Sequence, residues 1–217
     1  MDGIKNIPWK KQGCLKRVRK GADRSAIRRR SPEKINGTER TSYIKGREVM
    51  KVIGKQRNSR MCFICGMDNP IGLRAQFYNM EDGSVMTPFV FRREHQSFPE
   101  RVHGGLAATM IDELGLRAMW AKDQSEESFG VTMSLSVKYR KPVPYDEELF
   151  ARGIVVKESP KFVTIDAGIY DREGRLLVNG EAVYIKLNPE QIVSEAVDTH
   201  EEMCYLLEDE VRELPFR

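Results

Sequence analysis

The chain has 217 residues, of which 40% are hydrophobic and 31% are charged, and its formal net charge is +4. This length fits one domain with appendages, and the hydrophobic content is sufficient for a packed core. No run approaches the ~18 consecutive apolar residues that a membrane-spanning helix needs, and the N-terminus has no apolar secretory segment. Four cysteines are too few for a disulfide framework. We therefore expect a cytoplasmic protein that does not contact a membrane.

The net charge hides an asymmetry along the chain. Residues 1–60 carry 19 Lys and Arg against 5 Asp and Glu, so the remaining chain carries 17 basic and 27 acidic residues. Residues 1–60 also show no sustained helical or strand period, which predicts a basic, mobile N-terminal extension. A nucleic-acid-binding arm, an organellar transit peptide and sequence upstream of a start at Met50 are alternatives. Because charge runs are usually solvated, we do not expect nucleic acid as a partner.

Residues 61–188 have the patterning of a folded domain. Apolar residues alternate with period two over 73–77 and 85–91, and Asp82-Gly83 between them predicts a hairpin turn. Residues 104–120 are apolar nearly all round, which predicts a helix in the interior. Four further strands are predicted, at 131–139, 149–156, 162–170 and 176–187. Their connections are too short for parallel crossovers, so the fold class is α+β, an antiparallel sheet wrapped around one central helix.

The last segment, residues 189–217, predicts a separate amphipathic helix packed on this domain. Asn188 and Pro189 fit the N-cap and first helical positions, and apolar residues recur at helical spacing up to Leu207.

The candidate chemistry lies on the predicted central helix. Gly104 and Gly105 open it, so the first backbone amides are unobstructed, and the helix dipole favours a developing oxyanion there. Asp112 lies in the middle of the same apolar helix, where a carboxylate is costly and more often functional than structural. The alternative is that Asp112 or Glu113 only hydrogen-bonds backbone at an interface.

These residues resemble a known family. His103-Gly104-Gly105, with Asp112 nine residues after the histidine, is similar to the signature of hotdog-fold acyl-CoA thioesterases of the phenylacetate-pathway (PaaI-like) type. The flanking segments 62–73 and 130–142 add to the resemblance, which covers about residues 61–188 and implies the hotdog fold. It does not extend to residues 1–60 or to the C-terminal segment.

The resemblance also implies roles for single residues. The Gly104 amide would polarise the thioester carbonyl, and Asp112 would act as nucleophile or general base. Thr132 would position the water or the acid, while His103 would orient the substrate or support the helix start. Gly105 is also a candidate substrate contact.

Two further pairs are candidate substrate contacts. Relatives often have Asn or Gln as a second carbonyl donor six residues before the histidine, but here that position is Ser97, with Gln96 beside it. Lys157 and Lys161 flank a turn and are candidates for contacting coenzyme A phosphates, although exposed lysines are more often only solvated.

The cysteine pattern gives little support to a metal. Cys62 and Cys65 form one Cys-x-x-Cys pair, whereas a structural zinc usually needs two such pairs, and Cys14 and Cys204 lie at irregular spacings. We therefore predict no metal and no cofactor, and we assign Gly66 to a tight turn.

The predicted activity is hydrolysis of an acyl-CoA to the free acid and coenzyme A, with the acyl group unspecified. Acyl carrier protein is an alternative leaving group. A non-catalytic acyl-CoA-binding module or lipid-responsive regulator, with its basic arm on nucleic acid, is the alternative function. Gly104 and Asp112 are separated by eight residues, about 12 Å along a helix, so one straight helix cannot supply both to one carbonyl. We therefore predict a twofold homodimer, or a dimer of dimers, with shared sites.

Overall fold

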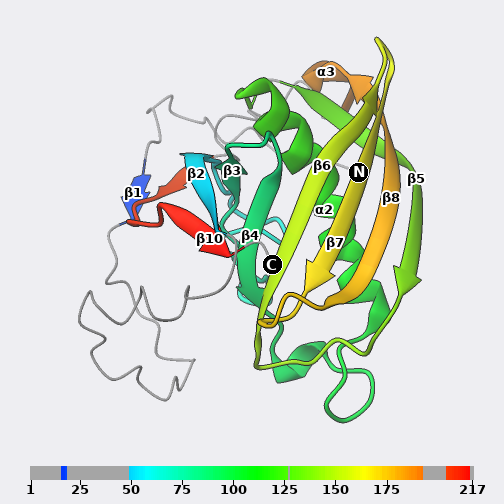
Figure 1. The fold of residues 1–217 in the computed structure, drawn as a ribbon. Coiled ribbons are helices and arrows are strands. Elements are labelled where there is room, and N and C mark those ends of the chain that lie inside the picture. Colours follow the sequence, from blue (N-terminus) through cyan, green and yellow to red (C-terminus); the bar gives the residue numbers. More distant parts are fainter. Residues whose placement is uncertain (1–15, 19–48, 127, 193–203, 216–217) are drawn as a thin grey trace, which may run out of the picture.

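The computed structural model describes residues 16–18, 49–126, 128–192 and 204–215 (Figure 1). One long helix, α2 (Gly104–Asp123), is accompanied by the 3₁₀ turn η1 (Arg93–His95) and the short helix α3 (Pro189–Ile192). The strands are β1 (Lys16–Val18), β2 (Val49–Lys55), β3 (Tyr78–Met80), β4 (Val85–Val90), β5 (Phe129–Tyr139), β6 (Glu148–Glu158), β7 (Phe162–Tyr170), β8 (Leu176–Leu187), β9 (Tyr205–Leu207) and β10 (Glu213–Pro215). No helix among these residues has the length and hydropathy that a membrane span requires.

Eight of the strands form one antiparallel sheet in the order β10-β2-β3-β4-β6-β7-β8-β5. The sheet curves around α2, which contacts strands β3 to β8 (Figure 1). This arrangement confirms the predicted antiparallel sheet around one central helix. A separate two-stranded sheet pairs β1 with β9 in parallel.

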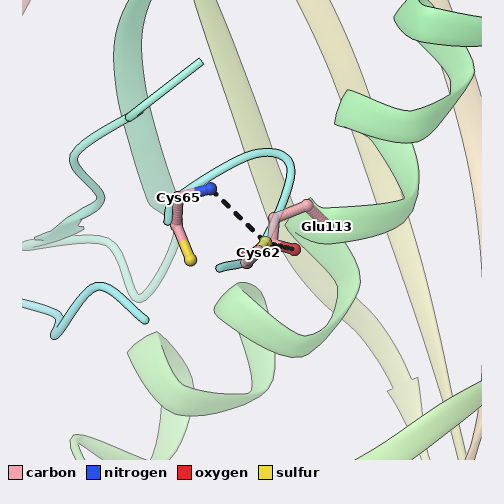
Figure 2. Close-up of side chains that lie close together, drawn as sticks. All are labelled: Cys62, Cys65 and Glu113. Carbon is pink, nitrogen blue, oxygen red and sulfur yellow. Dashed lines mark hydrogen bonds between the residues drawn. The ribbon is translucent and has the colours of Figure 1, made fainter. Parts of the chain in front are cut away.

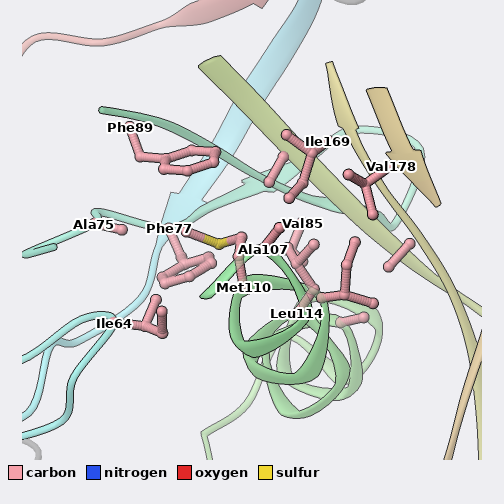
Figure 3. Packing of buried hydrophobic residues seen from close by; sticks show 14 of the residues in the cluster. Ile64, Ala75, Phe77, Val85, Phe89, Ala107, Met110, Leu114, Ile169 and Val178 are labelled. Carbon is pink, nitrogen blue, oxygen red and sulfur yellow. The ribbon is translucent and has the colours of Figure 1, made fainter. Parts of the chain in front are cut away.

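The core lies between α2 and the concave face of the sheet. Along β7, alternate residues Val163, Ile165, Ala167 and Ile169 are buried, because successive side chains of a strand point to opposite faces. Figure 3 shows helix residues such as Met110 packed against side chains from the sheet. Complete burial of one such apolar side chain contributes about 1.5–3 kcal/mol, so this interface fixes the position of α2.

The predicted elements of the central region are largely confirmed. The strands at 162–170 and 176–187 match β7 and β8, and the helix continues to Asp123. It ends there because the next residue, Gln124, adopts a left-handed conformation with φ of 51°.

The prediction of a strand over 73–77 is wrong. The Leu73 and Ala75 amides donate to Phe63 and Ile64 in the preceding turn, so their bonds do not continue the β3 ladder. Arg74 has a φ of 55°, which interrupts the extended backbone, and the strand begins only at Tyr78. The alternating apolar residues of this segment, Ala75 and Phe77, are nevertheless buried in the core.

The boundary expected at residue 61 needs a correction. Strand β2 lies inside the sheet, between β3 and β10, and Met50 packs with Tyr78, Met80 and Leu214 in a second apolar cluster. The domain therefore also includes residues 49–60, which were expected to belong to the N-terminal extension. The remaining residues of that extension, apart from β1, lie outside the described residues.

The C-terminal segment also differs from the expected helix. A helix begins at Pro189 as predicted, but α3 ends at Ile192, and residues 193–203 lie outside the described residues. Leu207, which was expected to be helical, lies in β9, and Leu214 lies in β10. Pairing of β10 with β2 stabilises an extended conformation that helical spacing alone does not reveal.

Candidate active site

The N-terminus of α2 is the first part of the candidate site. His103 is the N-cap, and its Nδ1 accepts a hydrogen bond of 3.0 Å from the Gly105 amide. This contact shows His103 supporting the helix start, which is one of its two expected roles. Because the Gly105 amide is used by the cap, Gly104 is the candidate carbonyl donor of the two glycines. The Tyr139 hydroxyl donates to the Gly104 carbonyl at 2.9 Å, and a Cβ on Gly104 would lie 3.3 Å from its ring.

A pocket of about 350 Å³ opens beside this helix end. Its volume is within the range of small-ligand sites. The wall includes Gly104 and Tyr139 together with three basic residues, Arg101, Arg140 and Lys141. The pocket therefore combines a helix N-terminus with positive charge, a combination that suits an anionic ligand.

Asp112 is the second part of the candidate site, two turns further along α2. Its Oδ1 accepts a hydrogen bond of 2.6 Å from the Thr132 hydroxyl on β5. The structure therefore brings these two residues together, as the resemblance implied. Asp112 is half-buried and Thr132 is exposed, so the carboxylate lies close to the protein surface.

Tyr184 on β8 also belongs to the Asp112 group, and the sequence analysis did not identify it. Its hydroxyl lies 3.2 Å from Asp112 Oδ1 and hydrogen-bonds to the Asp112 backbone oxygen. Burial, with a further contribution from the Asp112 carboxylate, raises the pKa of Tyr184, so the phenol stays protonated. A Cβ on Gly115 would collide with the Tyr184 ring. A glycine inside an apolar helix was the sequence signal for this close approach.

The expected second carbonyl donors lie at the N-terminal end of α2. Gln96 forms an isolated bridge with Val102, and the Ser97 amide donates to the Arg101 carbonyl. The loop that contains them is joined to the N-cap residue, since the His103 amide donates to the His95 carbonyl at 2.8 Å. Both Gln96 and Ser97 are exposed at this end of the molecule.

The two candidate lysines lie at the other end of the helix. Glu158, next to Lys157, forms an ion pair with Lys122 in the last turn of α2, and the Lys161 carbonyl accepts from the Lys186 amide. A 20-residue helix is about 30 Å long, so one chain does not bring Lys157 and Lys161 to Gly104.

A second group of reactive side chains lies on the neighbouring face of α2. Figure 2 shows Cys62 and Cys65 in a tight turn facing Glu113. A hydrogen bond from Cys62, with help from Arg117 and Ser59, lowers the pKa of Cys65 to about 7 despite its burial. The Cys62 pKa is raised by its hydrogen bond with Cys65, and burial and Glu113 add to this effect, so the pair can share one proton. Cys62, Cys65 and Glu113 are the residues with metal-binding geometry in the described part of the chain.

Similarity to known proteins agrees with this geometry. Residues 100–178, which contain α2 and β5 to β7, match the model of the thioesterase superfamily. The rat acyl-coenzyme A thioesterase THEM4 is 25% identical over 140 residues, covering 63% of this chain and 58% of the relative. Human acyl-coenzyme A thioesterase 13 is 22% identical over 135 residues, covering 62% of this chain and 89% of the relative.

Solved structures support the fold. A crystal structure of a thioesterase superfamily protein superimposes with a TM-score of 0.52 at 24% identity, over 58% of this chain and 60% of that protein. The match with THEM4 spans less than two thirds of that relative's length. The curved antiparallel sheet around a single central helix is the hotdog fold, and residues 100–178 within it are similar to the thioesterase superfamily.

Proposed function

We propose that the protein hydrolyses an acyl-CoA thioester to the free acid and coenzyme A. The observation that carries the proposal is the Asp112 carboxylate, held by the hydroxyls of Thr132 and Tyr184 on a helix that begins with Gly104. Both relatives described above are named as acyl-coenzyme A thioesterases, which supports this substrate class.

The chemistry follows from the two parts of the site. As general base, Asp112 takes a proton from water while the water oxygen bonds to the thioester carbon. The Gly104 amide stabilises the resulting oxyanion, and collapse of the tetrahedral intermediate breaks the carbon–sulfur bond and releases the coenzyme A thiolate. As nucleophile, Asp112 would attack the same carbon and expel the coenzyme A thiolate, which leaves a mixed anhydride between the acyl group and Asp112 that water then hydrolyses. Thr132 orients the same carboxylate oxygen in both routes.

The complete site requires a second copy of the chain. The Gly104 and Asp112 positions are about 12 Å apart along α2, so each must act with a counterpart from another protomer. Strand β5 is the edge of the sheet, and Val131, Met133 and Leu135 on it are exposed by 38%, 57% and 37%. An apolar edge strand of this kind favours self-association, here as a homodimer or a dimer of dimers.

The pocket beside Gly104 supports a position for the coenzyme A part of the substrate. Its basic residues Arg101, Arg140 and Lys141 would bind the phosphates, since lysine and arginine form charge-assisted bonds to phosphate oxygens. The contribution of Lys157 and Lys161 stays a prediction, and it would have to come from the partner protomer.

The first experiment is a thiol-release assay of the purified chain against a panel of acyl-CoAs. Release of free thiol with saturation kinetics is the expected result. Saturable acyl-CoA binding without turnover on any member would instead support the alternative, a non-catalytic acyl-CoA-binding module.

A complementation experiment tests the shared site. An Asp112→Asn chain is mixed with a Gly104→Pro chain and subunits are allowed to exchange. Proline is tolerated at the first helical position, so Gly104→Pro removes the amide hydrogen without interrupting the helix. Each heterodimer should carry one intact site, and activity should reappear. Continued inactivity of heterodimers verified by two affinity tags would contradict the shared site, and Gly104→Ala, which keeps the amide, is the matched control for the proline.

A further inference from the structure

The turn that contains Cys62 and Cys65 presents both sulfur atoms as hydrogen-bond acceptors. Cys62 Sγ accepts from the amides of Ile64 at 3.3 Å and Cys65 at 3.4 Å. Cys65 Sγ lies 3.5 Å from the Ser59 amide and 3.4 Å from the Ser59 hydroxyl. Amide donors directed at sulfur stabilise the thiolate, which is the form that binds metals.

The tight turn depends on glycine at position 66. The Gly66 amide donates to the Cys62 carbonyl at 2.8 Å, and any Cβ at this position would collide with the backbone of Cys62. The chain therefore closes tightly behind the two cysteines, whose sulfur atoms lie within 4.8 Å of each other.

A third acceptor comes from the central helix. Glu113 Oε2 lies 3.6 Å from Cys62 Sγ, and the two sulfur atoms and a carboxylate oxygen all lie within 4.8 Å of one another (Figure 2). In a tetrahedral zinc site with Zn–S of about 2.3 Å and Zn–O of about 2.1 Å, a sulfur–oxygen edge measures about 3.6 Å. The spacing of Cys62 and Glu113 thus fits two ligands of one zinc ion.

When both thiols are ionised, the charged groups around this point carry a net negative charge that a divalent cation would neutralise. Arg117 is 1% exposed, and its Nε donates to the other Glu113 oxygen, Oε1, at 2.8 Å. Its Nη1 donates to the Arg57 carbonyl at 2.8 Å. Two thiolates, one carboxylate and one guanidinium sum to a charge of −2, which a zinc ion neutralises. Because Arg117 bonds to Oε1, the other oxygen of Glu113, Oε2, stays directed at the sulfur atoms. Hydrogen-bond partners commonly orient a ligating carboxylate in this way.

We propose that Cys62, Cys65 and Glu113 bind a zinc ion, with solvent in the fourth position. Cys62 and Glu113 are only partly buried, which gives solvent access to that position. Binding releases the thiol protons to solvent and forms two Zn–S bonds and one Zn–O bond, with no change in oxidation state. Thiolate ligands in a tetrahedral arrangement select zinc over magnesium or calcium.

The ion would connect the Cys62–Cys65 turn to α2, across 51 residues of sequence. Glu113 is adjacent to Asp112, so the connection would fix the helix directly behind the candidate catalytic carboxylate. The site itself does not depend on the proposed hydrolysis, and its tests measure metal rather than turnover.

The experiment uses the full-length chain under reducing conditions. Zinc content is measured by plasma mass spectrometry after purification, and again after chelator treatment and reloading with zinc alone; about one ion per chain is expected. Reloading with Co²⁺ should give a thiolate-to-cobalt charge-transfer band together with the visible bands of a tetrahedral ion. Cys62→Ser and Cys65→Ser should lose the ion, and Glu113→Gln should weaken zinc affinity by at least about 10-fold. The matched control is Cys204→Ser, at a buried cysteine outside the group, and it should retain zinc.

A labelling measurement avoids variants that fail to fold. Zinc should slow alkylation of Cys62, the partly exposed cysteine of the pair, in the unmodified protein. Failure of the folded, reduced chain to retain or reload zinc would overturn the proposal. So would a Cys62–Cys65 disulfide, detected as the loss of two hydrogen masses, that forms equally with and without zinc.

Discussion

Asp112 and Glu113 are neighbours on α2, yet their carboxylates lie in different chemical surroundings. Consecutive residues of an α-helix point about 100° apart, so Asp112 faces β5 and β8 while Glu113 faces the cysteine turn. The Asp112 carboxylate accepts hydrogen bonds from two neutral hydroxyl groups, those of Thr132 and Tyr184. Glu113 receives the buried guanidinium of Arg117. The comparison separates an acid whose negative charge can act on a substrate from an acid whose charge is neutralised within the fold.

Removing the guanidinium should give the largest effect. Arg117→Met leaves Glu113 without its cation beside the cysteines, and breaking a buried ion pair in this way costs about 3–5 kcal/mol. Urea denaturation monitored by circular dichroism should show this loss of unfolding free energy. Arg175→Met, at an exposed arginine that forms an i,i+4 pair with Asp171, is the control and should change the midpoint far less. Equal effects of the two substitutions would mean that burial of Arg117 is not important for stability.

Removing the charge of the other acid should affect catalysis. Asp112→Asn keeps the volume and the helix but lacks the anionic oxygen needed for attack or proton abstraction. We expect kcat on acyl-CoA to fall by on the order of 10²-fold or more, with KM changing far less. Asp123→Asn, the same substitution in the last turn of α2, is the control. Retention of most of the wild-type kcat in Asp112→Asn would remove Asp112 from the catalytic role.

The tyrosine hydroxyl beside Asp112 should have a smaller effect. Tyr184→Phe keeps the ring against Gly115 but removes the contact to the carboxylate, and one lost hydrogen bond is worth up to roughly a 10-fold decrease in kcat. KM and the melting temperature should change little, because the packing is preserved. Tyr205→Phe removes a comparable hydroxyl–carboxylate bond, to Asp68, at a site outside the Asp112 group. If both variants lower kcat equally, Tyr184 does not position Asp112.

The sequence predicts Asp112 better than Glu113, and the reason is physical. Helix 104–123 and strands 162–170 and 176–187 are specified by local periodicity, and Asp112 is conspicuous within an apolar helix. The contact between Glu113 and Cys62 joins residues 51 apart and leaves no local pattern.

Pairing between the two ends of the domain was missed for the same reason. Strand β10 pairs with β2 over residues that are far apart in the sequence, so the boundary at residue 61 and the C-terminal helix were misjudged. Tyr184 reads as an ordinary strand residue until the fold places it against Gly115.

A third acid extends the comparison to the surface of the sheet. Asp82 lies in the turn between β3 and β4 and pairs with Arg152 of β6 at 2.5 Å. Burial raises the pKa of the Asp82 carboxyl, but hydrogen bonds from Ser84 and the ion pair with Arg152 outweigh this and lower it below its usual value of 3.8. Asp82 thus resembles Glu113 in having a guanidinium partner, but its side chain is more exposed, 35% against 19%.

The lowered pKa predicts a small, pH-dependent contribution to stability. Because the carboxyl binds its proton less tightly in the folded state, the stabilisation is complete above the unfolded pKa and is lost as the pH falls through the lower, folded pKa. Asp82→Asn keeps an oxygen that can accept from Ser84 but removes the charge facing Arg152. Its melting temperature should therefore lie below that of the wild type at pH 7, by an amount that diminishes below pH of about 4. In an Arg152→Gln background, the difference in melting temperature that Asp82→Asn causes should be smaller. If the difference between wild type and Asp82→Asn does not depend on pH, the turn geometry, rather than the ion pair, stabilises this part of the sheet.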